Sequence, residues 1–208
     1  MFSFIIKGGP VMIPIILGSI IGLAIVIERF WVFRHMKLDT FEFVQEIFKD
    51  LKTNRIKNAL ELCNKYIRHP LVAVFKIGIE RSDLPLDRLE KILEQAGNNQ
   101  IQKLEKFLGA LVSIISIEPL LGFLGTITGL IRAFMSWEHA GANVTVSVLA
   151  AGIYEAMITT AAGLIIAIPF YLCYHYFINR IKITANELTN HCIQLLEIIA
   201  ETKEVTTK

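Results

Sequence analysis

The sequence predicts an all-α, polytopic membrane protein with three transmembrane helices. Of its 208 residues, 53% are hydrophobic, and the mean hydropathy of +0.52 is high for a soluble domain. Three apolar runs are each long enough to cross a hydrocarbon core of about 30 Å as a helix. Charged sequence lies between and after these runs, with apolar residues every three or four positions. We therefore expect long helices that extend from the membrane into an aqueous helical domain.

The first membrane span is expected within residues 1–33. Residues 8–27 carry no charge, and an aromatic cluster that begins at Phe30 follows them as an interfacial anchor. The segment differs from a secretory signal peptide because no small-residue cleavage site ends it and Glu28 and Arg29 continue the helix. We expect it to be retained.

Residues 34–106 are expected to form a cytoplasmic helical domain. Asp39 or Thr40 is suited to cap its first helix, the His69-Pro70 step breaks a later one, and a turn at 82–85 opens another. The apolar stripe expected to pack the first of these helices is Phe41, Val44, Phe48 and Leu51. The last helix keeps its stripe up to the next apolar run, so we predict that it continues unbroken into the second span.

The second span is expected at residues 107–135. It contains three glycines whose spacing permits close helix contact, Gly122, Gly125 and Gly129, with Thr126 beside them. Glu118 is an acid in an apolar run and precedes Pro119, which is expected to kink the helix. The sequence leaves two roles open for Glu118: a structural side chain that reaches the nearby aqueous interface, or a functional acid.

Residues 136–143 are a short periplasmic loop, and residues 144–178 are the third span. Pro169 is expected to kink that span, and small residues there, Gly152 and Gly163, suit helix packing. Residues 179–208 are predicted to form a further amphipathic helix and tail in the cytoplasm.

Glu155 is the acid around which the third span is organised. Placing a carboxylate at bilayer depth costs about 2.5 kcal/mol or more, so an intramembrane acid indicates function. A helix that begins near Val144 puts Glu155 about 16 Å along its axis, close to the midplane of the bilayer. Gly152, Thr159 and Ala162 share its face, which should therefore contact protein or a narrow water path. The alternative is a structural Glu155 bonded to a neighbouring helix.

Basic residues near the ends of the spans predict the orientation. Most of them fall on one side, which we assign to the cytoplasm, and only Lys7 and Arg132 are assigned to the other. The cytoplasmic set is Arg29, Arg34, Lys37, Lys103, Lys106, Arg180 and Lys182. The N-terminus is therefore expected outside and the C-terminus inside.

Composition excludes several classes of function. The net charge of +2 offers no broad basic surface for nucleic acid. The three cysteines are scattered and the five histidines form no pair at metal-ligand spacing, so we expect no metal and no cofactor. An intramembrane hydrolase would need a Ser/His pair, two membrane aspartates or an HExxH motif, and the sequence has none of these. We expect the protein not to be an enzyme.

Two segments, PLLGFLGTITGLIRAF in the second span and GIYEAMITTAAGLIIAIP in the third, resemble the signature of the MotA/TolQ/ExbB proton-channel family. Span number, orientation and length resemble its ExbB/TolQ branch. The resemblance implies a pentameric ring in a bacterial inner membrane around two copies of an ExbD/TolR-like single-span partner that brings an aspartate into the pore. It also implies proton-driven work at the outer membrane, through a TonB-like or TolA-like protein.

By this resemblance, the pore-lining threonines of the family fall on Thr126 and Thr160 and its intramembrane glutamate on Glu155. Thr159 stands where relatives often have alanine, and Glu118 where they usually have a small neutral residue. Because the helical wheel puts Thr159 nearer Glu155 than Thr160, the sequence does not decide which threonine lines the path. The alternative to a channel is a non-conducting scaffold held together by its small-residue helix faces.

Overall fold

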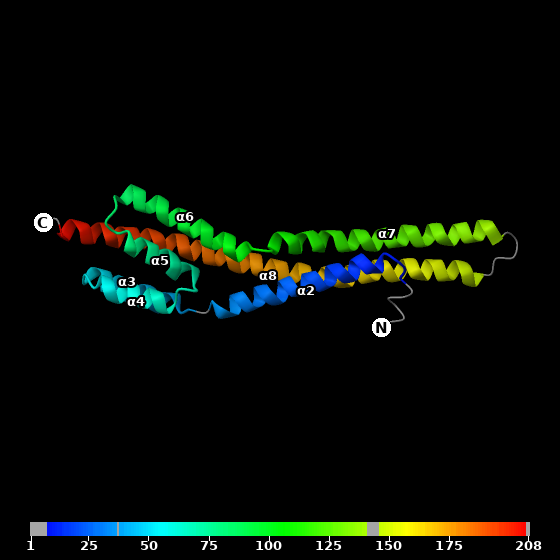
Figure 1. The fold of residues 1–208 in the computed structure, drawn as a ribbon, viewed down its shortest axis with the longest axis horizontal. Helices are drawn as coiled ribbons and strands as arrows, with labels where there is room; N and C mark the ends of the chain where they lie inside the picture. Colours follow the sequence, from blue (N-terminus) through cyan, green and yellow to red (C-terminus); the bar gives the residue numbers. More distant parts are fainter. Residues whose placement is uncertain (1–7, 37, 141–145, 207–208) are drawn as a thin grey trace. The chain divides into compact units, whose positions relative to one another are not determined.

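The computed structural model describes residues 8–36, 38–140 and 146–206, and these residues form helices and no strand (Figure 1). The helices of this described part are α2 (Met12–His35), α3 (Thr40–Lys52), α4 (Ile56–Lys65), α5 (Pro70–Glu80), α6 (Leu86–Glu105), α7 (Leu108–Ala140) and α8 (Val146–Thr206). Three helical stretches are long and apolar enough to cross a membrane: Met12–His35, Leu86–His139 and Ala150–Lys203. The prediction of an all-α protein with three spans is confirmed.

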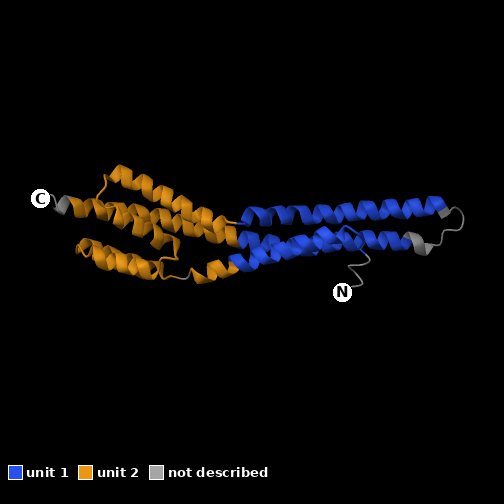
Figure 2. Ribbon diagram, viewed as in Figure 1, with its two compact units in different colours: residues 1–29, 107–176 blue, residues 30–106, 177–208 orange. Residues whose placement is uncertain are grey.

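The chain divides into two compact units (Figure 2). Unit 1 comprises Met1–Arg29 and Phe107–Tyr176, and unit 2 comprises Phe30–Lys106 and Phe177–Lys208. Unit 1 thus contains most of α2, all of α7 and the first part of α8, which are the apolar stretches. Unit 2 contains the charged helices α3 to α6 with the last part of α8.

Unit 1 is held together by close contact between α7 and α8. We call this contact the α7–α8 seam and define it by Gly122, Gly125 and Gly129 of α7 and Gly152, Ala156 and Gly163 of α8. A Cβ atom placed on Gly122 would lie 2.9 Å from the backbone oxygen of Thr159, and one on Gly129 would lie 3.2 Å from that of Gly152. The two backbones therefore approach so closely that a methyl group at Gly122 would force one helix to shift, and one at Gly129 would be tightly packed. In a membrane, where lipid is as apolar as leucine, such packing is what drives helix association.

Unit 2 has the hydrophobic core of an ordinary helical domain. Asp39 caps α3, since its carboxylate accepts a hydrogen bond from the Glu42 backbone N–H. Val44 and Leu51 are buried as predicted, but Phe41 is exposed. The core side of α3 is turned toward Phe43 and Ile47 instead, because the helix packs on α4 and α5 through a stripe that the sequence pattern alone does not single out. The last part of α8 completes this core with Leu188, Cys192, Leu195, Ile198 and Ile199.

Cysteines Cys63 and Cys192 lie in that core and have no disulfide partner. Burial raises the pKa of the Cys63 thiol to about 12, so the thiol remains protonated at physiological pH. Both residues act as small apolar side chains.

Two helix boundaries differ from the prediction. The expected continuous helix into the second span is interrupted between Glu105 and Leu108, where Phe107 has a φ of 65°. The Arg29 guanidinium lies 6.0 Å from the centre of the Phe107 ring, and this cation–π contact favours the turned-out position of the ring. Conversely, the expected separate C-terminal helix is continuous with the third span, since α8 runs unbroken from Val146 to Thr206.

Pro119 and Pro169 lie inside α7 and α8, respectively, and both helices continue through them. Each proline removes one backbone hydrogen bond from its helix. The kinks expected at these positions stay predictions.

We predict that Leu195→Ala destabilises the protein by about 2–5 kcal/mol, the range for removing a fully buried leucine from a packed core. Leu195 is 0% exposed and packs tightly on Gly78, where a Cβ would lie 2.9 Å from the Leu195 Cδ2 atom. The substitution would therefore leave a cavity inside a packed core. Thermal unfolding followed by circular dichroism in detergent measures the change. Ile193→Ala on the same helix, where the side chain is 53% exposed, is the matched control and should change stability little; equal losses would contradict this account of the core.

Candidate functional site

A pair of threonine hydroxyls lies in the α7–α8 seam. Thr126 of α7 and Thr160 of α8 are hydrogen-bonded to each other through their Oγ1 atoms. Each also lies within hydrogen-bond distance of a seam carbonyl: Thr126 of Ala156 at 3.2 Å and Thr160 of Gly122 at 3.1 Å. Because each hydroxyl has a single proton, one of the two donates to the other and its partner donates to a carbonyl. The two threonines that the family resemblance assigned to one pore thus come together within a single chain, and both are partly exposed.

Thr159 has a different environment from its neighbour. It is 0% exposed and donates to the Ala156 backbone oxygen at 2.9 Å. Its side chain fills the space that Gly125 leaves, with Cγ2 3.0 Å from where a Cβ on Gly125 would lie. Thr159 is therefore a packing residue of the seam within this chain, and its hydroxyl does not reach the open face on which Thr160 is partly exposed.

Glu155 forms an ion pair with Arg132. The Arg132 Nη1 atom donates to the Glu155 Oε1 atom at 2.8 Å, across 23 residues of sequence, from α7 to α8. The Arg132 side chain is 50% exposed and that of Glu155 is 25% exposed. Glu155 is therefore bonded to a neighbouring helix, which is the contact that the structural alternative expected. The guanidinium balances the carboxylate, which lowers the cost of placing either charge in an apolar region.

The ion pair lies beside the chain segment that precedes α2. A Cβ on Gly9 would overlap the Glu155 Oε1 atom and lie 3.4 Å from Arg132 Nη1. Gly9 has a φ of +68°, a conformation that glycine adopts without the strain other residues would incur. Glu155 is thus level with the beginning of α2. Its expected place near the midplane of the bilayer stays a prediction.

Glu118 is buried among the three apolar helices. Its side chain is directed at α2, where a Cβ on Gly18 would overlap the Glu118 Oε1 atom and lie 3.2 Å from Cδ. On the other side, a Cβ on Gly163 of α8 would lie 3.2 Å from the Glu118 carbonyl carbon. The residue is 1% exposed, so within the described chain its side chain does not reach the aqueous interface as the structural interpretation proposed.

The polar groups form three levels along α7. Thr126 lies eight residues after Glu118, and Arg132 lies six residues after Thr126. These separations correspond to about 12 and 9 Å along the helix axis. The Arg132–Glu155 and Thr126–Thr160 pairs are partly exposed on unit 1, whereas Glu118 is enclosed by it. Hydroxyls both donate and accept hydrogen bonds, so the threonine pair has the chemistry needed to pass a proton, and the ion pair places fixed charges on the same unit.

Two parts of this site were missed from the sequence. Arg132 was assigned to the outer aqueous phase, and the Gly8-Gly9 step was treated only as the beginning of a span. A signal was present for each: Arg132 falls seven residues after Gly125, on the glycine-rich side of α7, and paired glycines before a helix often mark a close approach.

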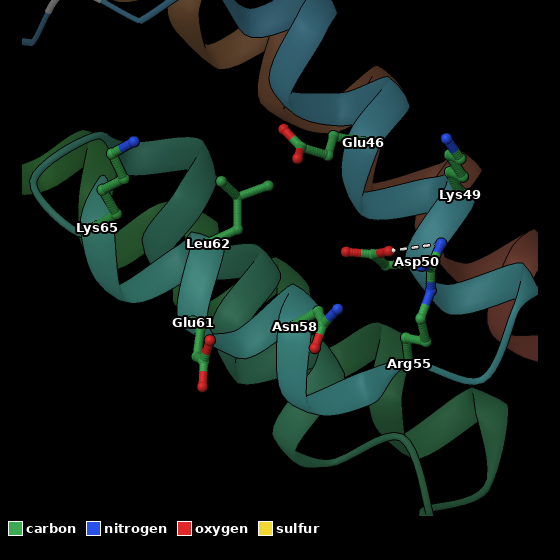
Figure 3. Close-up of a pocket in the computed structure, with 8 residues that line it drawn as sticks. All are labelled: Glu46, Lys49, Asp50, Arg55, Asn58, Glu61, Leu62 and Lys65. Atoms are coloured by element: carbon green, nitrogen blue, oxygen red, sulfur yellow. Dashed lines mark ion pairs between the residues drawn. The ribbon is translucent and has the colours of Figure 1, made fainter.

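A separate polar pocket lies in unit 2 between α3 and α4 (Figure 3). Asp50 points across it to Arg55, with their charged atoms 3.2 Å apart. The remaining lining residues are Glu46, Lys49, Asn58, Glu61, Leu62 and Lys65. Acids and bases are equal in number here, so the pocket has no preference for an ion of either sign. Among the residues that the structure describes, no group of three or more His, Cys, Asp or Glu side chains is placed to hold a metal.

We predict that Gly122→Ala lowers stability by about 1–3 kcal/mol, the usual cost of overpacking, because the added methyl would press on the backbone of α8. Gly109→Ala on the same helix is the matched control, since a Cβ there meets nothing within 4 Å and alanine favours helix. Thermal unfolding of the two detergent-solubilised variants measures the difference. A Gly122→Ala protein as stable as Gly109→Ala would show that the seam is looser than described.

Comparison with known proteins identifies the family. Residues 63–190 match the family described as the MotA/TolQ/ExbB proton channel family. The chain is 31% identical over 166 residues to the biopolymer transport protein ExbB-like 1 of Synechocystis sp., covering 78% of this chain and 65% of that protein. It is 28% identical over 171 residues to ExbB-like 3 of the same organism, covering 82% of this chain and 81% of the relative.

The Tol-Pal system protein TolQ of Haemophilus influenzae is 35% identical over 98 residues, which are 47% of this chain and 41% of TolQ. The chain thus spans somewhat less than two thirds of the length of the first of these relatives and less than half that of TolQ. The family match includes all of α7 and most of α8, so it contains both threonines and the ion pair of the seam. This multi-pass membrane protein belongs to the MotA/TolQ/ExbB proton channel family.

Proposed function

We propose that the chain is the proton-channel subunit of an ExbB/TolQ-like complex in a bacterial inner membrane. We further propose that a proton path is lined by the open α7–α8 face, the side of the two helices on which Thr126, Thr160, Arg132 and Glu155 are partly exposed. The observation that carries this proposal is the exposed Arg132–Glu155 ion pair on a membrane-spanning unit. A half-exposed guanidinium is expensive to place against lipid tails. Its face is therefore covered by another chain or by water, and a ring of such subunits around a hydrated centre supplies both.

In this proposal the Thr126–Thr160 pair is the relay and Thr160, rather than the enclosed Thr159, is the threonine of α8 that meets the path. Hydroxyl groups in contact can exchange hydrogen-bond partners as a proton passes, with water completing the chain on the open side. Glu155 keeps its charge through Arg132 and sets the field at one end of the path. It does not itself carry the proton.

The proton carrier is supplied by a partner. By resemblance, five copies of this chain surround two copies of an ExbD/TolR-like protein, whose single span brings an aspartate past the hydroxyl pairs. The membrane potential supplies about 2.3 kcal/mol per charge per 100 mV, which is enough to bias rotation between equivalent subunits in one direction. The output is work at the outer membrane through a TonB-like or TolA-like protein, with protons as the transported ion and no cofactor.

The second candidate is a non-conducting scaffold. The α7–α8 seam supports it, because close glycine packing is all that a scaffold needs. The scaffold interpretation gives no role to the ion pair on the open face, because apolar side chains there would hold a scaffold together equally well.

We predict that Glu155→Gln sharply reduces partner-dependent proton flux, because Gln keeps the shape of the side chain while leaving the Arg132 charge uncompensated. Flux is measured as pH change in vesicles that contain this chain and its candidate single-span partner. Arg132→Gln should have the same effect, and the double variant should be no worse than either single one, since both remove the same pair. Glu138→Gln, at an exposed glutamate of α7, is the control and should conduct normally.

Full flux in Glu155→Gln would reject the role given to the ion pair. Absence of flux in the unchanged protein with every single-span partner tested would instead favour the scaffold.

A further inference from the structure

Glu118 is a buried carboxyl group without a hydrogen-bond partner on one of its oxygens. It is 1% exposed, and its Oε2 atom bonds to none of the residues that the structure describes. Its carboxyl is directed at Gly18 of α2, where a Cβ atom would overlap the Oε1 atom, while Gly163 of α8 packs on the Glu118 backbone carbonyl. A side chain at position 18 would displace the carboxyl, so the fold holds room for the group although no described residue bonds to its Oε2 atom.

Charged neighbours do not explain this placement. On α2 the nearest ionisable residue along the chain is Glu28, ten residues after Gly18 or about 15 Å along the axis, and it is paired with Arg29. On α8, Glu155 lies eight residues before Gly163 and is paired with Arg132, while Tyr171 lies eight residues after it, each about 12 Å away along the axis. On α7, Arg132 lies still farther from Glu118 in sequence, as does Lys106, which precedes that helix.

An ionised carboxylate in this position would be a buried charge with neither a counter-ion nor a full set of donors, which is among the most costly arrangements in a protein interior. A cation would need several oxygen ligands, and Gly18, which faces the carboxyl, has no side chain to supply one. A bound proton removes the charge without any further ligand. It leaves a neutral acid of about the size of glutamine, with one O–H group to donate.

We propose that Glu118 is a proton-binding site at the junction of α2, α7 and α8, distinct from the Thr126–Thr160 relay, and that its bound proton keeps α2 seated on the other two helices. Release of the proton would leave a bare anion against Gly18, which only entry of water or withdrawal of α2 could relieve. The two glutamates of the spans thus have opposite states: Glu155 is an anion balanced by arginine and Glu118 is a neutral acid. This inference does not depend on whether the chain conducts protons.

The test is infrared spectroscopy of the purified full-length chain in lipid at neutral pH, without a partner. The expected result is an absorption band from the C=O stretch of a protonated carboxyl group, lost completely in Glu118→Gln and retained in the matched control Glu155→Gln. Solvent-exposed carboxylates are ionised at this pH and do not contribute to the band. As the pH is raised, loss of the band should coincide with loss of thermal stability in the unchanged protein, and Glu118→Gln should lack that alkaline loss.

Absence of the band from the unchanged protein, or its persistence in Glu118→Gln, would overturn the proposal. Glu118→Met, which fills the same space without hydrogen-bonding groups, provides a second variant should Glu118→Gln not fold, and must also lose the band. Loss of the band in Glu155→Gln but not in Glu118→Gln would show that Glu155 holds the proton, and it would overturn the proposal as well. Because no flux is measured, failure here leaves the proposed channel function unaffected.

Discussion

The close approach of the α7 and α8 backbones is the constraint on which the rest of unit 1 depends. Glycines at Gly122 and Gly129 let the two helices touch backbone to backbone, and only at that separation can Thr126 and Thr160 hydrogen-bond to each other and to carbonyls of both helices. In lipid this contact is favoured by packing and by those bonds, since burial of apolar surface gains nothing there. A wider separation would break the bonds that cross between the helices and leave each hydroxyl only a carbonyl of its own helix.

Much of the fold could be predicted because its determinants are local. Span length, the Asp39 cap and the break at Pro70 are written in consecutive residues, and the structure contains all of them. The interruption at Phe107 and the unbroken α8 were not predicted, because they depend on contacts distant in sequence. Phe107 turns out beside Arg29, and the end of α8 is held by the core of unit 2, neither of which a periodic pattern records.

The site divides in the same way. The resemblance to a family named Thr126 and Thr160 together, and the structure brings their hydroxyls into contact; their pore-lining role stays a prediction. The difference in burial between Thr159 and Thr160 could not be predicted, because it depends on helix rotation, which glycine positions on the facing helix decide. Arg132 could not be matched to Glu155 from sequence spacing, since the two lie on different helices. Composition shows that an acid is present, but only packing shows whether an arginine or a proton balances it.

The most direct test of this account is to replace Thr126 and Thr160 together by cysteine in a chain whose three native cysteines have been changed to alanine, and to oxidise the assembled protein in its membrane. The account predicts a disulfide within one chain, so the denatured protein keeps the mass of a monomer while its two new thiols become unreactive, because the two side chains meet inside the α7–α8 seam. A disulfide-linked dimer, or two thiols that stay free, would contradict the account.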